Sequence, residues 1–429
     1  MTERIAGTYA PTLTDSADPV IGTWDTGRPG PTVVAVGALH GNEPSGLLAL
    51  GRVLAHLRQA EVPLRGRFVG LVGNRAAHAA RVRYHVRDLN RGWDDARVGA
   101  LLARPPADDD AEDRAQRALL GVLAPLLAAA TEPLVFVDLH SMSSHGPPFA
   151  VLGDTLRNRR VGLSLCIPVV LGLDETIDGT LMGWLVDQGH VGVGVEAGQH
   201  EDPASIDVHC SILWLTLAAA GAVDEGMCPW LPEHRRSLRG HALDLPAVLE
   251  LRHHHRTPAG DGFVMRPGFR NFARVRAGDA LADDAQGVIT APFSGHLMLP
   301  RYQPQGDDGF FMASSVRRVW LDLSARLRAT KAHRWITRLP GVVPHPDLPD
   351  HYRVEAHRIR HHVVNVFHLL GYRRRHVEEE WLVFSRRRPD HREDPSDATD
   401  QAGQADGVDR GGDPSHDDRS AGSQPPKAR

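Results

Sequence analysis

Between about residues 19 and 225, short apolar runs alternate with stretches whose apolar residues recur at helical spacing. A short apolar run predicts a buried strand, and a longer periodic stretch predicts a helix. The predicted strands are Val33–Val36, Phe68–Val72, Val135–Leu139, Phe149–Leu152 and Val191–Val195. The predicted helices are Leu47–Leu57, Ala111–Ala130, Gly179–Gln188 and Ser205–Ala220. This alternation predicts an α/β domain with a mixed, mostly parallel sheet.

The pattern changes near residue 230. From about 250 to 313, closely spaced turn residues separate brief β-type runs, which predicts a small all-β module. Helical spacing returns in Val316–Arg328 and Val354–Leu370, and a strand-like run, Trp381–Phe384, follows, so we expect a mainly helical extension. The final stretch has one large aliphatic residue, Val408, and no aromatic residue, which predicts disorder. The predicted organisation is a lead-in (1–18), an α/β domain (19–230), a β module (231–315), a helical extension (316–385) and a disordered tail (386–429).

Composition narrows the class of protein. The chain has 429 residues, of which 41% are hydrophobic, so it can bury a large core. A net charge of −4 gives no argument for nucleic acid or an anionic membrane as partner. Three cysteines without close spacing argue against a disulfide framework. No apolar run resembles a signal peptide or a membrane span, so we expect a cytoplasmic protein.

The loop Gly37–Gly46 carries the first candidate chemistry. It lies between a predicted strand and a predicted helix, where α/β sheets place their sites. His40 and Glu43 in this loop can supply two ligands of a zinc site. The alternative is a polar loop that only caps the next helix.

Two further predicted strands end in polar residues. His140 can supply a third ligand and leave a fourth position for water, which is the arrangement of a catalytic zinc. Strand alternation puts Asp138 on the same side as His140, where it can orient the imidazole. Next to zinc, Glu196 would be a general base. The alternatives are a hydrogen-bonded core histidine and a salt-bridged glutamate.

The stretch Arg81–Trp93 is dense in guanidinium groups. Arginine binds carboxylates through two hydrogen bonds and stabilises a developing oxyanion. We therefore expect a small-molecule substrate that bears a carboxylate. The alternative is a solvated basic loop. For the runs His253–His255 and His361–His362, a solvated turn and a helix face are favoured over metal sites.

Four features occur in one order along the chain: His40-Gly-Asn-Glu43, Asp88-Leu-Asn90-Arg91, Asp138-Leu-His140-Ser141 and the strand-end Glu196. With them, residues 30–315 resemble the succinylglutamate desuccinylase/aspartoacylase family of zinc carboxypeptidase-like hydrolases, and especially its uncharacterised bacterial members. The resemblance implies an α/β/α catalytic domain followed by a small β module. It also implies one Zn²⁺ per chain, held by His40, Glu43 and His140.

The same resemblance implies roles for other residues. Glu196 would be catalytic, Arg83 would polarise the scissile carbonyl, and Asn90 with Arg91 would hold a substrate carboxylate. The implied reaction is hydrolysis of a small N-acyl amino acid, or a related carboxylate, by metal-activated water. The alternative functions are a carboxypeptidase-type peptidase or an esterase with the same zinc site, and a non-catalytic metal- or carboxylate-binding protein.

The chain departs from the family pattern at two positions. Val186 stands where aspartoacylase has an additional arginine for acidic groups of its substrate, which puts N-acetylaspartate itself in question. Tyr302 is a loose match to a tyrosine that reaches the substrate in aspartoacylase, and a surface aromatic on a β turn is the favoured alternative.

Overall fold

The structure is a computed structural model. It describes residues 18–258, 260–339, 341–348, 351–355, 366–378 and 380–386. Apart from Asp18 and Arg386, the predicted lead-in and tail lie outside these residues. In the described ranges, no helix has the length and apolar character needed to cross a bilayer.

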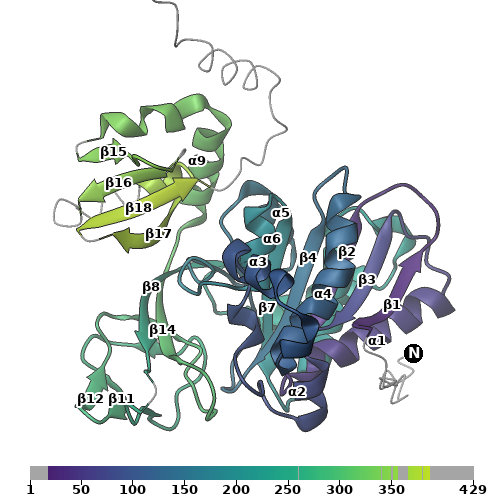
Figure 1. Cartoon of the computed structure of the whole chain (residues 1–429), viewed down its shortest axis with the longest axis horizontal. Helices are drawn as coiled ribbons and strands as arrows, with labels where there is room; N and C mark the ends of the chain where they lie inside the picture. Colours follow the sequence, from purple (N-terminus) through teal and green to yellow (C-terminus); the bar gives the residue numbers. More distant parts are fainter. Residues whose placement is uncertain are drawn as a thin grey trace, which may run out of the picture. The chain divides into compact units, whose positions relative to one another are not determined.

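An 11-stranded mixed sheet forms the centre of the fold, in the order β1-β3-β2-β4-β7-β5-β6-β8-β14-β13-β10 (Figure 1). Its first strands are β1 (Val20–Asp25), β2 (Thr32–Gly37), β3 (Arg67–Val72), β4 (Val135–Met142), β5 (Phe149–Leu152), β6 (Val169–Leu171) and β7 (Val191–Gln199). The five strands predicted here are confirmed. The sequence did not predict β1, which is mostly half-buried and interrupted by Gly22, or β6, which is very short.

Helices cover both faces of this part of the sheet, which gives three layers. One face carries α1 (Pro44–Gln59), α5 (Leu156–Ser164), α7 (Ala204–Ala219) and α8 (Leu231–His241). The other carries α2 (Arg75–Ala80), α3 (Asp95–Ala103), α4 (Ala111–Ala128) and α6 (Leu181–Asp187). Short 3-10 turns are η1 (Leu89–Arg91), η2 (Pro106–Asp108) and η3 (Glu225–Met227). The four predicted helices are confirmed as α1, α4, α6 and α7.

The start of α4 shows how the sequence fixes a boundary. The Asp110 side chain accepts a hydrogen bond from the Asp113 backbone N–H at 2.7 Å. The Asp113 side chain accepts one from the Asp110 backbone N–H at 3.1 Å. This capping box satisfies N–H groups that a helix start otherwise leaves open. It accounts for the start of the helix that the sequence predicts at Ala111.

The direction of the central strands sets the position of the site. Strands β3, β2, β4 and β7 pair in parallel in that order. Their carboxyl ends therefore meet at one edge of the sheet, where open α/β sheets bind ligands. Every residue of β4 is buried, as expected for a strand with helices on both faces.

The β-rich region predicted from 250 to 313 is confirmed, and most of its strands extend the central sheet. Strand β8 (Val248–Arg256) pairs in parallel with β6, and β14 (Asp308–Ser315) pairs antiparallel with β8. Strands β13 (Gly295–Met298) and β10 (Arg274–Val275) follow in the same sheet. Three further strands form a separate antiparallel sheet: β9 (Val264–Met265), β11 (Ala280–Asp284) and β12 (Gly287–Thr290).

The predicted all-β module is helical at its beginning, because α8 occupies residues 231–241. Proline stands in the first turn of α8, where its missing N–H costs no hydrogen bond. Leu231 and Leu238 lie two helical turns apart and are both fully buried in the core that α7 shares. Packing of this single apolar face therefore fixes a helix in a segment whose other positions are mainly polar.

The C-terminal extension contains a sheet, of which the sequence predicted one strand, Trp381–Phe384. Its first helix is confirmed as α9 (Arg318–Ala329), followed by the 3-10 helix η4 (Lys331–Arg338). A four-stranded antiparallel sheet then forms from β15 (Val342–Pro344), β16 (His351–Glu355), β17 (Tyr372–Glu378) and β18 (Trp381–Arg386).

The helix predicted for 354–370 is wrong at its start, since Val354 and Glu355 belong to β16. Val354 pairs with Leu382 of β18 and packs in one core with Phe367 and Phe384. Pairing and burial outweigh the helical spacing here. Residues 366–369 are helical, whereas 356–365, including His361–His362, lie outside the described residues.

A buried ion-pair network joins the extension to the α/β domain. Asp154, which follows β5, lies 2.5 Å from Arg159 Nε of α5. Its other carboxylate oxygen lies 2.7 Å from Arg328 Nη2 of α9. All three side chains are nearly inaccessible to solvent. One carboxylate thus compensates two buried guanidinium groups.

We predict that Asp154→Ala lowers the free energy of unfolding by about 3–5 kcal/mol, since it removes the carboxylate that the two buried guanidinium groups share. Urea denaturation followed by circular dichroism measures this change. Asp207→Ala is the matched control, because it breaks the exposed pair with Arg52, and exposed pairs contribute little. Equal effects of the two substitutions would contradict the assignment of a stabilising role to the buried network.

Candidate active site

The loop between β2 and α1 places His40 and Glu43 at the carboxyl edge of the sheet. The Glu43 backbone N–H donates to the His40 carbonyl at 3.1 Å, which closes a turn. The Gly41 N–H donates to the Arg83 carbonyl at 3.1 Å. A Cβ on Gly46 would lie 2.6 Å from Leu139 Cβ, so glycine lets α1 approach β4 closely. The glycines of this loop are therefore part of what positions its polar residues.

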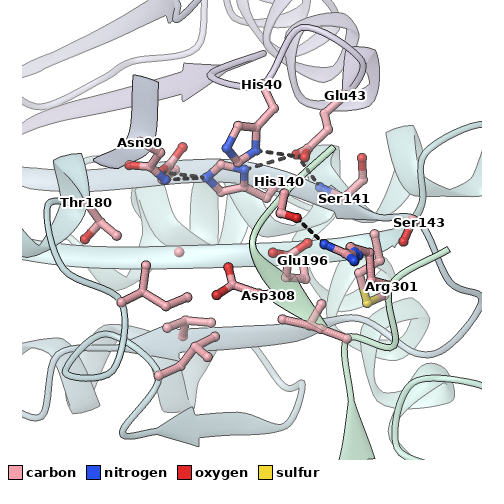
Figure 2. Close-up of a pocket in the computed structure, with 18 of the residues that line it drawn as sticks. His40, Glu43, Asn90, His140, Ser141, Ser143, Thr180, Glu196, Arg301 and Asp308 are labelled. Atoms are coloured by element: carbon pink, nitrogen blue, oxygen red, sulfur yellow. Dashed lines mark hydrogen bonds and ion pairs between the residues drawn. The ribbon is translucent and has the colours of Figure 1, made fainter. Parts of the chain in front are cut away.

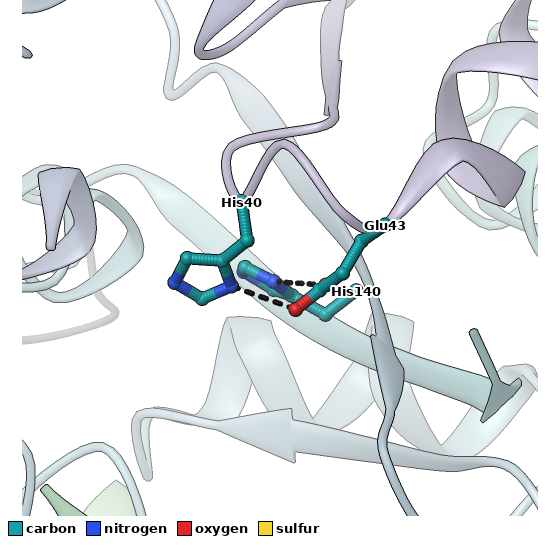
Figure 3. A group of neighbouring side chains, drawn as sticks. All are labelled: His40, Glu43 and His140. Carbon is teal, nitrogen blue, oxygen red and sulfur yellow. Dashed lines mark hydrogen bonds and ion pairs between the residues drawn. The ribbon is translucent and has the colours of Figure 1, made fainter. Parts of the chain in front are cut away.

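Glu43 lies between two imidazoles (Figures 2 and 3). Its Oε1 is 2.8 Å from His40 Nδ1, and its Oε2 is 3.0 Å from His140 Nδ1. Among the described residues, these three form the group whose ligand atoms, all within 4.8 Å of one another, could hold a metal ion. His140 comes from β4, the strand next to β2. The structure thus brings the three predicted metal ligands together.

In each imidazole, the nitrogen that does not contact Glu43 lies close to an aspartate. His40 Nε2 lies 3.1 Å from Asp88 Oδ1, and His140 Nε2 lies 2.8 Å from Asp138 Oδ2. Such carboxylates orient a ligand ring and fix which nitrogen faces the metal. The position of Asp138 beside His140 agrees with strand alternation. The partnership of Asp88 was not predicted, because nothing local sets it apart from the other charged residues of its loop.

Glu43 and the two histidines favour each other's charged forms. Burial opposes ionisation of Glu43, but the adjacent histidines hold its pKa well below the usual value. Burial lowers the pKa of His140, yet the carboxylates of Asp138 and Glu43 outweigh it and hold that pKa well above the usual value. Two imidazoles and one carboxylate are a ligand set typical of catalytic zinc. The neighbouring carboxylates supply negative charge that a divalent cation would neutralise.

Glu196 lies on the strand next to His140. The two residues are register partners across β4 and β7. Its Oε2 atom is buried and has no hydrogen-bond partner among the described residues. Burial is the main reason that the pKa of Glu196 is raised to about 8. An unpaired buried carboxylate is costly, so this atom fits a position that faces a cation or a substrate group.

Arg83 lies in the loop after α2, close to Glu43. Its Nη2 donates to Asp88 Oδ2 at 3.0 Å, and its Nη1 lies 3.4 Å from Glu43 Oε1. Its Nε is buried without a hydrogen-bond partner among the described residues. The guanidinium group is therefore fixed in place and keeps one donor available.

Asn90 and Arg91 belong to η1. The Asn90 Oδ1 accepts a hydrogen bond from the Leu181 N–H at 2.9 Å, and its Nδ2 lies 3.4 Å from His140 Nε2. Arg91 Nη2 donates to Asp308 Oδ2 at 2.8 Å. One pocket is lined by all seven predicted site residues: His40, Glu43, Arg83, Asn90, Arg91, His140 and Glu196. It encloses about 980 Å³, part of which is open to solvent.

The loop between β13 and β14 forms another wall of this pocket. Gln303 Oε1 accepts a hydrogen bond from Asn42 Nδ2 at 3.1 Å. Gln305 Oε1 accepts one from the Arg83 backbone N–H at 3.2 Å. Asp308 at the start of β14 also lines the pocket. Sequence reasoning missed these residues, because their positions in a turn-rich region carry no pattern that points to the site.

The other residues that the sequence singled out are not site residues of this pocket. The Tyr302 hydroxyl donates to the Arg266 carbonyl at 2.8 Å, and the side chain does not line the pocket. Val186 is buried in α6. The run His253–His255 belongs to β8 rather than to a turn, because it pairs with β14. His254 Nε2 lies 2.7 Å from Asp308 Oδ1.

Comparison with known proteins gives the class of this domain. Residues 29–205 match the model of the succinylglutamate desuccinylase/aspartoacylase catalytic domain. The structure resembles that of succinylglutamatedesuccinylase/aspartoacylase from Rhodobacter sphaeroides, with a TM-score of 0.51 and 18% identity over 68% of this chain and 87% of that one. Residues 29–205 therefore resemble the catalytic domain of the succinylglutamate desuccinylase/aspartoacylase family, as the motifs predicted.

Two further similar structures have lower TM-scores. Succinylglutamate desuccinalase from Vibrio parahaemolyticus has a TM-score of 0.49 and 15% identity over 68% of this chain and 84% of that one. The product-bound ectoine utilization protein EutE (DoeB) from Ruegeria pomeroyi has a TM-score of 0.47 and 23% identity over 67% of this chain and 86% of that one. A search of curated proteins gave no match.

We predict that Asp138→Asn weakens the binding of a divalent metal about 10–100-fold, because it removes the carboxylate that orients His140. His40→Ala, which removes a ligand, should weaken binding further. Isothermal titration with metal-free protein measures both. The exposed His241 of α8 provides the control, and His241→Ala should bind metal like the unaltered protein. Unchanged affinity in His40→Ala would overturn the assignment of the metal group.

Proposed function

We propose that the protein is a zinc-dependent hydrolase that cleaves the amide bond of a small N-acyl amino acid or a related carboxylate. The observation that carries the proposal is the placement of Glu196 beside a buried His-Glu-His group in one pocket. The match of residues 29–205 to the succinylglutamate desuccinylase/aspartoacylase catalytic domain supports the reaction class. The cytoplasmic location stays a prediction.

His40, Glu43 and His140 would hold the zinc ion, one per chain. Bound zinc polarises a carbonyl group and lowers the pKa of water to about 7. Glu196 would accept a proton from the attacking water and then donate it to the leaving amine nitrogen. Its pKa of about 8 reflects burial, and a nearby divalent cation would lower that pKa, because positive charge favours the carboxylate. Glu196 would then be ionised and ready to act as a base at neutral pH.

Arg83 would stabilise the carbonyl oxygen of the scissile amide as negative charge develops on it. The buried, unpaired Nε supports this role, because it leaves one donor available after Asp88 and Glu43 are bound. Asn90 and Arg91 would hold the substrate carboxylate at the same wall of the pocket. Arginine is suited to this role, since its fork of donors matches a carboxylate.

A small substrate is favoured over a polypeptide. Two hydrogen bonds hold the loop between β13 and β14 in place. Gln303 accepts one from Asn42, in the loop that carries His40 and Glu43, and Gln305 accepts one from the Arg83 backbone N–H. These hydrogen bonds place a wall close to the candidate metal ligands, which restricts an extended chain. Esters differ from N-acyl amino acids in the leaving group, and peptides differ in the acyl part, so a substrate panel that includes all three separates the reactions.

We predict that Glu196→Gln lowers kcat/KM about 10²–10⁴-fold, which is the usual contribution of a general base. Its zinc content should stay at one per chain, because Glu196 is not a predicted ligand. Release of free amine from N-acyl amino acids, followed by mass spectrometry, measures the first quantity, and metal analysis measures the second. The control is Glu201→Gln, an exposed glutamate just beyond β7. Full activity in Glu196→Gln would show that another group takes the proton.

We also predict that dialysis against a chelator abolishes hydrolysis and lowers the melting temperature, since metal binding stabilises the folded state. Adding zinc back should restore both. Activity that survives complete metal removal would refute a metal-dependent mechanism. In the His40→Ala protein, the melting temperature should not respond to zinc.

A further inference from the structure

The arginine expected to hold a substrate carboxylate already has an acidic partner. Arg91 Nη2 donates to Asp308 Oδ2 at 2.8 Å, and Nη1 donates to the Asn90 carbonyl at 2.9 Å. Asp308 also lies 2.7 Å from His254 Nε2. Figure 2 shows Asp308 in the pocket, on a different wall from His40 and Glu43. The positive charge of Arg91 is thus balanced within the pocket.

The other arginines that line the pocket are engaged as well. Arg83 is paired with Asp88. Arg301 donates to Thr257 Oγ1 at 2.8 Å, and its guanidinium carbon lies 4.9 Å from the ring centre of Phe263. Of the arginines that line the described pocket, each therefore has a partner in the protein. Among the described residues, Arg301 has no acidic partner, but its guanidinium group is held on the protein by the Thr257 hydroxyl and the Gly306 carbonyl.

Negative charge and apolar surface make up much of the remaining lining. Burial raises the pKa of Asp308, but the hydrogen bond from His254 and the charge of Arg91 outweigh it and hold that pKa below its usual value. Asp308 is therefore ionised at neutral pH. The apolar wall consists of Val151, Leu173, Ile177, Met182, Leu299 and Phe311.

We infer that Asp308 restricts the enzyme to N-acyl amino acids that carry a single carboxylate. The inference rests on the proposed function and concerns its substrate class. One carboxylate can share Arg91 with Asp308. A second anionic group that lies near Arg91, on the side chain or the acyl group, would meet the negative charge of Asp308, and such like-charge contacts reject a ligand.

Isosteric substrate pairs test this restriction, because they differ in charge and hardly in shape. N-acetylglutamine is compared with N-acetylglutamate, and N-acetylasparagine with N-acetylaspartate. For the zinc-loaded protein, we expect kcat/KM to be about tenfold or more higher for the amide member of each pair. In Asp308→Asn, which keeps an acceptor for Arg91 and removes the charge, this preference should fall about tenfold.

Binding supplies a second readout that does not need turnover. Isothermal titration of zinc-loaded Glu196→Gln with each pair should give the same preference in dissociation constants, and Glu196→Gln combined with Asp308→Asn should lose it. Asp283→Asn is the matched control, because it removes an equal charge from an exposed pair with Arg266 outside the pocket. Its preference should equal that of the unaltered protein. A purely structural role of Asp308 would change both members of a pair equally and leave their ratio intact.

The outcomes separate the two proposals. If acidic members are cleaved as well as or better than their amides, the proposed function stands and the restriction is wrong. If the ratio is unchanged in Asp308→Asn, the restriction has another origin and the role of Asp308 is refuted. If no member of the pairs and no other N-acyl amino acid is cleaved, the proposed function fails and the inference falls with it.

Discussion

The site depends on the burial of one carboxylate, that of Glu43, between two imidazoles. A buried carboxylate is stable only when opposite charge or hydrogen-bond donors surround it. The protein meets this requirement with residues from adjacent parallel strands, whose carboxyl ends meet at one edge. The Ser141 backbone N–H adds a hydrogen bond to Glu43 Oε2 at 3.0 Å. Strand direction, the close approach of α1 and the aspartates behind the rings all serve this one arrangement.

The site is built from two parts of the chain that lie far apart in sequence. The candidate metal ligands His40, Glu43 and His140 lie within the segment that matches the family model. Asp308 and the β13–β14 loop before it lie about a hundred residues beyond that segment. In the proposed function, the residues that bind and select the substrate thus come from both segments, whereas the proposed metal ligands and Glu196 come from the first. Changes in the β13–β14 loop can therefore alter the choice of substrate while the reacting groups stay in place.

The metal group and the central strands could be predicted because their determinants are local. Val33–Val36 and Val135–Leu139 are short, mainly apolar runs typical of buried strands; His140 follows the second directly, and His40 lies four residues after the first. Asp308 could not be predicted, because its role depends on pairing between β8 and β14 and on an arginine far away in sequence. Most of the sheet of the extension escaped prediction for a similar reason: Val354 follows helical spacing but is fixed by its partners on β18.

The pairing of β6 with β8 has a consequence for how the chain folds. Val169, Val170 and Leu171 form their ladder with residues 248–250, beyond the segment that matches the family model. A chain that stopped before residue 248 would leave the outer side of β6 without hydrogen-bond partners. Unpaired edges of this kind recruit strands from other molecules and promote aggregation. The segment that matches the family model and the β-rich region after it therefore share one continuous sheet, and separating them would expose a strand edge on each side of the cut.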